Sequence, residues 1–519
     1  MKSTRQFLAI ALVTLLSACG GGGGGNGSSG GVTPPTPPVV TPPVDPNPPV
    51  VPPVDPPPVT PERPDFLTRS NLCEHPRTGT QPSGLPYYDQ QGTLSDELRW
   101  LRSFIDESYL WYKEVPASVN MANYSNPLDY FAALKTPLIT ASGRAKDRFH
   151  FTYPSEVWEE LSGSGIALSY GITWSRSTGA LPRVWAVTLV EPGTPADLAG
   201  VRRGDLLSSV DGVDINDSSA GGIAVLNAGL FPVSAGETHR LVLKRAGVAL
   251  QAVSLQSQKI ATAPVRSTKV LDTPTGAVGY LLFGEHNAVA ERQLVDAFTT
   301  LKAAKVNDLV LDMRYNGGGY LVVASQLAYM IAGPAATDGK TFERLLPNDK
   351  RTPGAPEPFE TRTVGLSPSL PAGRALPYLG LKRVTVLTTA GTCSASESVI
   401  NSLRGVDVEV NLIGGETCGK PYAFLPQPNC GTTYFTIQVQ SVNNKGFGDY
   451  ADGFQPTCKA DDDLDHALGD TSERLLATAL SYRANGMCPA TPLRARSLER
   501  DGPMQLVRPE AKEISILRR

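Results

Sequence analysis

The sequence has few histidines, the residues whose side chains accept protons near neutral pH and often bind metals. Only five of its 519 residues are histidine, and none lies in a recognisable triad or metal motif. They are His75, His150, His239, His286 and His466. No pair of cysteines has the CxxC spacing of a zinc site. We therefore expect no zinc centre, and histidine is not an obvious general base.

Positive charge and nucleotide motifs are also lacking. The formal net charge is -3, with lysines and arginines scattered along the chain, so we predict no binding of nucleic acid. The strand-to-helix turn "DMRYNGGG" at 312–319 lacks the GxGxxG spacing of dinucleotide folds, and GxxxxGK[ST] does not occur, which argues against a nucleotide site. Long apolar runs are absent after the amino terminus, so we expect no membrane-spanning helix.

The amino terminus has the three parts of a secretory signal over residues 1–18. A short basic stretch "MKSTRQ" precedes the apolar run "FLAIALVTLL" and the small residues "SACG". "LSAC" resembles a bacterial lipoprotein signal, which implies cleavage before Cys19 and lipidation of its thiol; the alternative is an ordinary signal with a chance cysteine. Gly20 instead of aspartate implies the outer membrane. We expect a cell-envelope protein, attached through lipid alone and facing the periplasm.

Composition divides the rest of the chain. Residues 19–64 carry the lipid anchor and a Gly-rich and Pro-rich spacer, which is extended where proline dominates. Residues 65–161 are predicted to be helical, because "TLSDELRWLRSFIDESYLWY" places apolar residues three and four apart, with Ser95 as a possible cap. Residues 491–519 form a basic tail, predicted to be disordered or loosely docked.

Six cysteines follow Cys19, an even number that in an exported chain predicts disulfides. They are Cys73, Cys393, Cys418, Cys430, Cys458 and Cys488. Six cysteines allow fifteen pairings, and the spacing alone does not select one.

Residues 162–258 show short strands and turns. The stretch "VTLVEPGTPADLAGVRRGDLLSSVDGVDI" resembles a PDZ domain of the bacterial protease type. Such domains take an extended peptide as an added strand, with its terminal carboxylate on loop amides. We expect "GSGIALSYGI", at 163–172, to supply that loop and strand, with Gly165, Ile166, Ala167 and Leu168 binding the peptide. The partners would be polypeptides with free carboxyl termini.

Residues 259–490 alternate strands and helices, which predicts an α/β domain with a largely parallel sheet. Ligands in such sheets bind at the carboxyl ends of the strands. Two turns fall there, "DMRYNGGG" at 312–319 and "TTAGTCSASESVINSLRG" at 388–405. The chain is thus predicted to be an α/β multi-domain protein with a helical amino-terminal part.

Ser394 opens a predicted helix, and Ser394 with Glu397 fits a capping box. A cap and a nucleophile are indistinguishable within this window. Lys420 follows 26 positions later, in a turn after the strand of "VEVNLIGGETCGKP". Neighbouring parallel strands could bring the two turns together. A lysine acts as a base only when neutral, a form that desolvation favours.

Taken in order behind the PDZ segment, "DMRYNGGG", "GTCSASES" and "GGETCGKP" resemble the carboxyl-terminal processing (tail-specific) serine proteases. The resemblance implies a protease domain built from crotonase-like ββα repeats and a serine endopeptidase without cofactors. It places the nucleophile at Ser394, the general base at Lys420 and the oxyanion hole at the amides of Gly318 and Ala395. Substrate identity, cleavage site and oligomeric state are not implied.

The sequence departs from this family in two places. The family often has a glutamine four residues after the lysine to hold it, and here that residue is Phe424. Cys393 and Cys418 each lie close to a proposed catalytic residue, and we hypothesise a disulfide between the two turns. The alternative to a protease is a non-catalytic or weakly active PDZ scaffold that binds peptides. Whether the PDZ domain activates or inhibits is left open.

Overall fold

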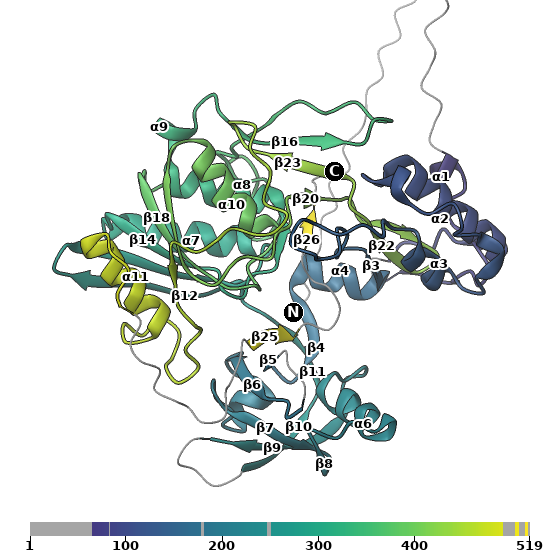
Figure 1. Ribbon diagram of the computed structural model, residues 1–519, viewed down its shortest axis with the longest axis horizontal. Helices are drawn as coiled ribbons and strands as arrows, with labels where there is room; N and C mark the ends of the chain where they lie inside the picture. The colour runs from purple at the N-terminus through teal and green to yellow at the C-terminus, as the bar shows by residue number, and fades with distance from the viewer. Residues whose placement is uncertain are drawn as a thin grey trace, which may run out of the picture. The chain divides into compact units, whose positions relative to one another are not determined.

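The computed structural model describes residues 65–81, 84–177, 181–245, 251–490, 504–507 and 514–516. The chain divides into two compact units, Met1–Glu62 and Arg63–Arg519, and all described residues belong to the second. The predicted signal peptide, Cys19 and the linker to residue 64 lie outside the described residues. Within the described ranges, no helix is both long enough and apolar enough to cross a membrane. Figure 1 labels the helices and strands and colours the chain by residue number.

The first described segment is mainly helical, as predicted. Its elements are α1 (Asp65–Thr68), β1 (Leu72–Cys73), β2 (Gln90–Gln91), α2 (Leu94–Ser108), α3 (Pro127–Ala133), β3 (Phe151–Pro154) and α4 (Ser155–Ser164), with 3-10 turns at Tyr112–Glu114 and Met121–Asn123. The apolar face of α2, including Leu98, Leu101 and Ile105, is buried. Ser95 is not the cap: Thr93 and Asp96 form a reciprocal capping box and start the helix two residues earlier.

The next segment is an antiparallel sheet with the order β10-β9-β7-β6-β5, and β8 pairs with β7. Its strands are β5 (Ile172–Ser177), β6 (Trp185–Val190), β7 (Leu206–Val210), β8 (Val213–Asp214), β9 (Thr238–Lys244) and β10 (Gln251–Gln256), with helices α5 (Pro195–Leu198) and α6 (Ala220–Leu230). Leu226 and Leu230 of α6 pack with Trp174 and Val187 in one apolar cluster. This small core packs α6 against the sheet, where the helix contacts β7, β8 and β9.

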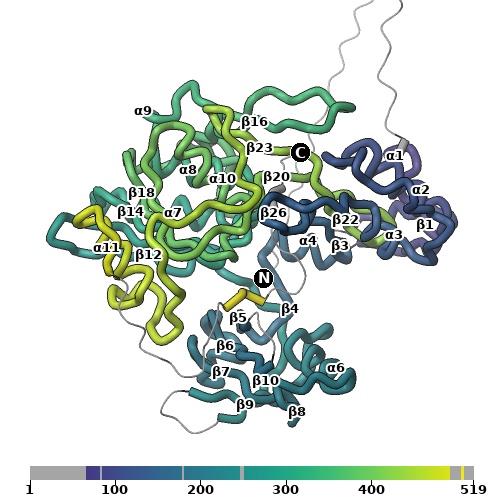
Figure 2. Tube along the Cα trace, in the orientation of Figure 1, coloured from purple at the N-terminus to yellow at the C-terminus, as the bar shows by residue number. Residues whose placement is uncertain are grey.

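A two-stranded ribbon lies at the boundary between this sheet and the rest of the chain. β4 (Ile166–Ser169) pairs antiparallel with β11 (Gln258–Ala261), the strands that enter and leave the small domain. The ribbon can be followed in the tube of Figure 2, where β4 is labelled.

The α/β domain contains a sheet with the order β12-β13-β14-β18-β19-β24. The strands are β12 (Val265–Thr273), β13 (Gly276–Phe283), β14 (Asp308–Asp312), β18 (Arg383–Thr388), β19 (Glu409–Gly414) and β24 (Cys458–Lys459). All neighbouring pairs are parallel except β12 with β13. The predicted largely parallel sheet is confirmed.

Helices cover both faces of this sheet, because alternate residues of each strand point to opposite sides. Leu281 and Phe283 of β13 join the cluster that includes α7 (Ala290–Ala303), α8 (Leu321–Ala332) and α10 (Ala395–Gly405). Val278 and Tyr280 of the same strand join the cluster that includes α11 (Arg474–Asn485). Figure 1 shows α7, α8 and α10 grouped apart from α11.

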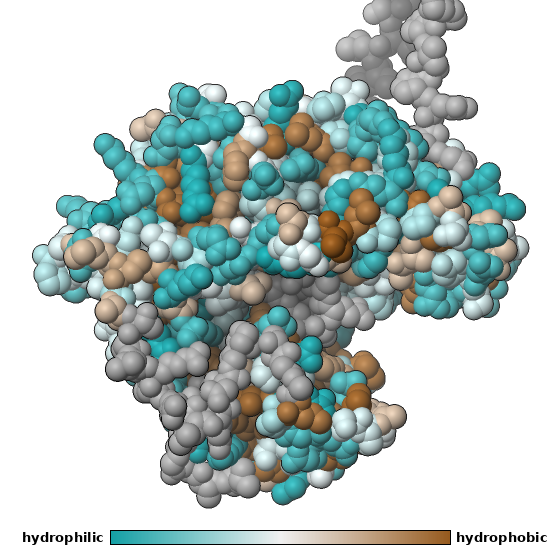
Figure 3. Space-filling model, in the orientation of Figure 1, coloured by the Kyte–Doolittle hydropathy of each residue, from teal (hydrophilic) through white to brown (hydrophobic). Residues whose placement is uncertain are grey.

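Smaller sheets join distant parts of the chain. β16 (Thr341–Pro347) pairs with β17 (Glu357–Pro358) and β23 (Val439–Val442), and β23 also pairs with β20 (Tyr422–Ala423). β22 (Thr432–Phe435) pairs with β21 (Gln427–Asn429) and with β3 of the helical segment. On the face in Figure 3, apolar side chains surface in separated patches among hydrophilic ones.

The six cysteines after Cys19 form three disulfides, Cys73–Cys430, Cys393–Cys418 and Cys458–Cys488. The hypothesised bridge between the two candidate catalytic turns is therefore confirmed. The Cys73–Cys430 bond ties the helical segment to the turn between β21 and β22.

Two short stretches of the basic tail form strands. β25 (Met504–Val507) pairs antiparallel with β5, and β26 (Ile514–Ile516) pairs in parallel with β15 (Gly318–Tyr320). Of the two alternatives expected for the tail, disordered or loosely docked, these residues are docked, because their backbones pair with existing strands.

Candidate active site

Ser394 lies at a sharp turn between β18 and α10. Its backbone has φ 62° and ψ -118°, a conformation that costs a residue with a side chain about 1–3 kcal/mol. A strained strand-to-helix turn of this kind holds a nucleophile at the helix start in other hydrolases. Ser394 is fully buried, and its N–H donates to Glu397 Oε2 at 3.0 Å. The predicted capping role of Glu397 is thus present at the same turn.

Glu397 also holds the turn that carries Lys420. Its Oε2 accepts the N–H of Lys420 at 2.8 Å, and its Oε1 accepts the N–H of Gly419 at 2.9 Å. The Thr417 hydroxyl donates to Oε1 at 2.5 Å. Burial raises the pKa of Glu397, an effect that these donors oppose. One carboxylate therefore fastens both candidate catalytic turns, a role that the sequence did not reveal.

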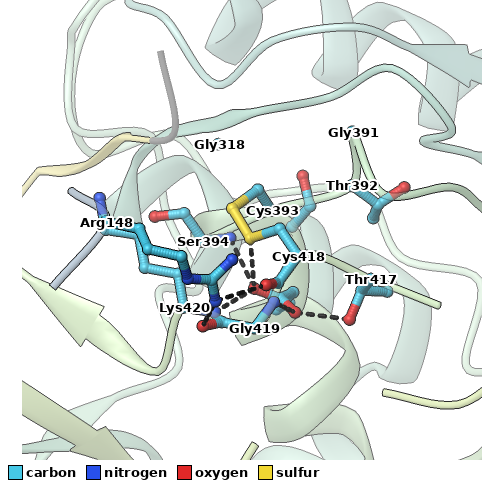
Figure 4. The surroundings of a disulfide bond; sticks show 12 residues. Arg148, Gly318, Gly391, Thr392, Cys393, Ser394, Thr417, Cys418, Gly419 and Lys420 are labelled. Atoms are coloured by element: carbon cyan, nitrogen blue, oxygen red, sulfur yellow. Dashed lines mark hydrogen bonds between the residues drawn. A yellow bond between two sulfur atoms is a disulfide. The ribbon is translucent and has the colours of Figure 1, made fainter. Parts of the chain in front are cut away.

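The Cys393–Cys418 disulfide is a second tie between the same turns (Figure 4). It lies directly before Ser394 and two residues before Lys420. Arg148, from the helical segment, donates to the carbonyl of Cys418 at 3.0 Å and to that of Ala451 at 3.3 Å. The turn that carries Lys420 is thus held by Glu397, by the disulfide and by Arg148.

Two cysteines and a glutamate in a small space could suggest a metal site. Atoms of Cys393, Glu397 and Cys418 lie within 4.8 Å of one another. The two sulfurs are bonded to each other, however, so neither is a thiolate ligand. The cluster therefore serves to connect the turns.

Lys420 is 1% exposed and lies between aromatic rings. Its Nζ is 4.3 Å from the centroid of the Phe424 ring and 4.8 Å from that of Phe149. The faces of aromatic rings attract an ammonium group, while the lack of water disfavours it. Phe424 therefore contacts the lysine directly, although it cannot supply the hydrogen bond of the family's glutamine. Phe149 is distant from Lys420 in sequence, and no sequence pattern predicts that the two residues are in contact.

The glycine-rich turn follows β14 and leads into β15. Gly318 has φ 103° and Gly319 φ 138°, conformations that favour glycine. A side chain at Gly319 would meet the His286 carbonyl, since its Cβ would lie 2.4 Å from that oxygen. The "GGG" turn is thus required by the close approach of two backbones.

Asn316 connects the glycine-rich turn to the serine turn. Its carbonyl accepts the N–H of Cys393 at 3.0 Å and the hydroxyl of Ser396 at 3.0 Å. Its Oδ1 accepts the N–H of Gly318 and lies 3.0 Å from His286 Nδ1. Burial lowers the pKa of His286 to about 3, so this imidazole is neutral. The N–H of Gly318, one predicted donor of the oxyanion hole, would have to leave Asn316 Oδ1 before it could donate to an oxyanion. Ala395, the other predicted donor, is buried at the first position of α10.

A charged network links the glycine-rich turn to the PDZ domain. Arg203, just before β7, donates to the Tyr315 hydroxyl at 2.7 Å and to Asp462 at 2.8 Å. Arg314 donates to the same Asp462 oxygen at 2.9 Å. Burial works against ionisation of Asp462, but the two arginines hold its pKa below its ordinary value. Tyr315 directly precedes Asn316, so the PDZ domain is connected to the turn.

The four residues expected to bind the peptide lie next to the PDZ sheet and are not part of it. Gly165 ends α4, and Ile166, Ala167 and Leu168 belong to the β4–β11 ribbon, outside the PDZ sheet. Apart from β25 of the tail, the outermost strand of that sheet is β5, which follows β4 directly in the chain. Ala167 and Leu168 still line the adjoining cavity.

That cavity has a volume of about 290 Å³ and joins the PDZ edge to the glycine-rich turn. Ile172 and Trp174 of β5 line one end, and Gly317, Gly318 and Gly319 line the other. Ser394 and Lys420 do not line it, and both are buried.

Comparison with known proteins gives matches along most of this architecture. A model described as peptidase family S41 matches residues 277–459, one of the peptidase S41 N-terminal domain matches 96–153, and one of a PDZ domain matches 186–224.

Individual proteins that are similar to this chain are also named as peptidases or proteases. A chloroplastic C-terminal processing peptidase of Tetradesmus obliquus is 28% identical over 356 residues, which is 64% of this chain and 69% of that protein. A carboxyl-terminal-processing protease of Synechocystis sp. is 24% identical over 355 residues, 66% of this chain and 74% of its own. A crystal structure from Bacteroides fragilis, assigned to the S41 proteases, has a TM-score of 0.58 at 25% identity and covers 75% of this chain and 97% of its own.

Proposed function

The chain belongs to peptidase family S41 and is a serine peptidase, and from this we propose that it cleaves polypeptides recognised by their carboxyl-terminal tails, with Ser394 and Lys420 as a catalytic dyad. The relatives named for carboxyl-terminal processing support the substrate class. The dyad is supported by one observation: the carboxylate of Glu397 accepts hydrogen bonds from the N–H groups of both Ser394 and Lys420.

In this mechanism neutral Lys420 takes the proton of the Ser394 hydroxyl while the oxygen attacks the peptide carbonyl. The tetrahedral oxyanion receives hydrogen bonds from the amides of Gly318 and Ala395, and such donors contribute several kcal/mol. Lysine returns its proton to the departing amine and leaves an ester on Ser394. Water, deprotonated by Lys420, then hydrolyses the ester.

The PDZ domain supplies recognition of the tail. An extended peptide would pair with β5, the outermost strand of the PDZ sheet apart from β25 of the tail. The cavity that runs from β5 to the glycine-rich turn supports the passage of the bound peptide toward the dyad.

The test compares Ser394→Ala and Lys420→Ala with matched variants outside the site. Ser402→Ala, also on α10, and Lys382→Ala, at an exposed lysine, serve as controls. The substrate is a peptide with a free apolar carboxyl terminus. Each dyad variant should lower kcat by about a thousandfold or more, and the controls should not. Activity retained in either dyad variant, with folding intact by circular dichroism, would remove the dyad.

A non-catalytic or weakly active PDZ scaffold is the second candidate. Phe424 at the position of the orienting glutamine and the engagement of the Gly318 amide by Asn316 favour it. A serine-directed acylating reagent distinguishes the two, because it should label Ser394 of a peptidase. Absent labelling together with measurable peptide binding would favour the scaffold.

We propose further that the mature chain is attached to the outer membrane through lipid on Cys19 and faces the periplasm. The support comes from the sequence "LSACG", which lies outside the described residues. Radiolabelled palmitate should enter the wild-type protein and not a Cys19→Ser variant. Equal incorporation into both would refute lipidation at Cys19.

A further inference from the structure

The PDZ edge that a peptide would use is occupied by the chain itself. β25 adds to β5 in antiparallel register, with Val507 opposite Trp174 and Met504 opposite Ser177. Without β25, β5 would be the last strand of its sheet. Addition of an extended segment to a sheet edge is how PDZ domains bind peptides. Met504–Val507 therefore occupies the position of a ligand.

Side chains anchor this strand. Leu506 and Val507 line the cavity between the PDZ edge and the glycine-rich turn. Val507 also packs against the apolar cluster that contains Trp174 and Leu230, whereas Gln505 is exposed. β25 thus fills the place where the apolar residues of a bound peptide would lie.

The second tail strand reaches the candidate active site. The backbone of β26 runs parallel to β15, with Ile514 opposite Gly318 and Ser515 opposite Gly319. β26 also contacts β20, which begins two residues after Lys420. Its backbone therefore lies against the glycine-rich turn and next to the base turn. Ser394 and Lys420 are both buried in this arrangement.

We propose that β25 and β26 are an intramolecular ligand of the PDZ edge and the glycine-rich turn, and that a substrate polypeptide must displace them. The inference rests on the proposed function, because it assigns the same edge to substrate tails. One sheet edge accepts one strand, so the tail and a substrate exclude each other. A tethered segment competes at an effective concentration in the millimolar range, so even a weak contact suffices.

The tail is also suited to being displaced. Val507 is followed by Arg508, so this segment presents no terminal carboxylate where it meets the PDZ domain. A substrate with a free carboxyl terminus gains the contacts of its carboxylate with loop amides, which the tail lacks.

The test measures binding, so that it does not depend on catalysis. The mature full chain in detergent, carrying Ser394→Ala, is titrated into a fluorescent peptide with a free apolar carboxyl terminus. Val507→Asp is compared with Gln505→Asp, which adds the same charge to the same strand at an exposed position. If the tail occupies the edge nine-tenths of the time, its release tightens binding about tenfold. We expect this gain for Val507→Asp and not for Gln505→Asp.

A second measurement removes the tail. The chain ending at residue 490 retains all six disulfide cysteines and should bind the peptide at least as tightly as the Val507→Asp variant. A synthetic peptide of residues 503–516 should then compete for it. Equal dissociation constants for wild-type, variant and shortened chains, or no binding to any of them, would overturn the inference. Failure of the proposed function would appear separately, as absent cleavage by chains with Ser394 intact.

Discussion

The N–H of Lys420 donates to the carboxylate of Glu397 at 2.8 Å, although 23 residues separate them in sequence. The same oxygen accepts the N–H of Ser394, so Glu397 fixes the two turns relative to each other. Distances within a dyad are sensitive, because a misplacement of about 1 Å can cost a hundredfold in rate. The geometry of the candidate site therefore depends on a buried carboxylate outside the proposed dyad.

Replacing Glu397 by glutamine should reduce activity strongly. A glutamine has one acceptor oxygen and adds an NH₂ donor that faces the four donors around it. We expect kcat to fall by about a hundredfold and the protein to lose about 1–3 kcal/mol of stability. Glu409→Gln, an exposed glutamate on β19, is the control. Unchanged kcat in Glu397→Gln would show that the turns hold their positions without this carboxylate.

The Cys393–Cys418 disulfide should affect rate as well as stability. It closes a loop of 25 residues, so its loss should cost about 3 kcal/mol. Loss of the Cys458–Cys488 bond, whose cysteines are 30 residues apart, should lower stability by a similar amount. This bond does not join the candidate catalytic turns. We expect paired serine substitutions of either bond to lower Tm alike, but only Cys393→Ser with Cys418→Ser to lower kcat. Equal kcat in the two variants would contradict a role in positioning.

Phe424 should support Lys420 through its ring. Phe424→Leu keeps most of the apolar volume but removes the ring face 4.3 Å from Nζ. A cation–π contact is worth about 0.5–2 kcal/mol, so kcat should fall several-fold with a modest change in Tm. Phe435→Leu, in the same apolar cluster, controls for packing alone. Identical effects of the two substitutions would argue that Phe424 acts only as core.

Arg203 should couple the PDZ domain to the glycine-rich turn. Arg203→Ala removes its hydrogen bonds to Tyr315 and Asp462, leaving Asp462 buried with one arginine fewer. We expect a loss of about tenfold in kcat/KM, whereas the exposed neighbour Arg202→Ala should have little effect. Steady-state cleavage of the same peptide measures both. A drop in Arg202→Ala of the same size would attribute the effect to surface charge.

Stability should depend on pH through Glu343 of β16. Burial raises the pKa of Glu343 to about 7, from an ordinary value of 4.5. The folded state therefore binds this proton more tightly than the unfolded state, so the contribution is complete below pH 4.5 and is lost as pH rises to 7. The loss amounts to about 3 kcal/mol.

Denaturant unfolding of wild type and Glu343→Gln at several pH values isolates this contribution. Glutamine does not titrate, so the difference in unfolding free energy between the two proteins should change between pH 4.5 and 7. The change should favour the variant at the upper end. A difference independent of pH would mean that folding does not shift the pKa of Glu343.

Local sequence determined much of this protein. Short segments carry the alternation of strands and helices, the PDZ turn pattern and the helical face of α2. They also carry the features that make Ser394, Lys420 and the glycine-rich turn candidates for the active site. Such patterns act within a few residues, because hydrophobic periodicity and turn chemistry are local. The parallel sheet and the α/β architecture follow from the same alternation.

Tertiary structure decided which distant residues meet. It places Phe149 next to Lys420, Arg203 next to Tyr315, and Glu397 in contact with both candidate catalytic turns. It also selects the three disulfide pairings. Sequence pattern predicted a peptide-binding strand at residues 165–168, and only the pairing of the strands shows that β4 joins β11 whereas β5 joins the PDZ sheet. The tail strands are the clearest case: four residues with weak local preference become a strand because β5 offers unpaired backbone groups for them.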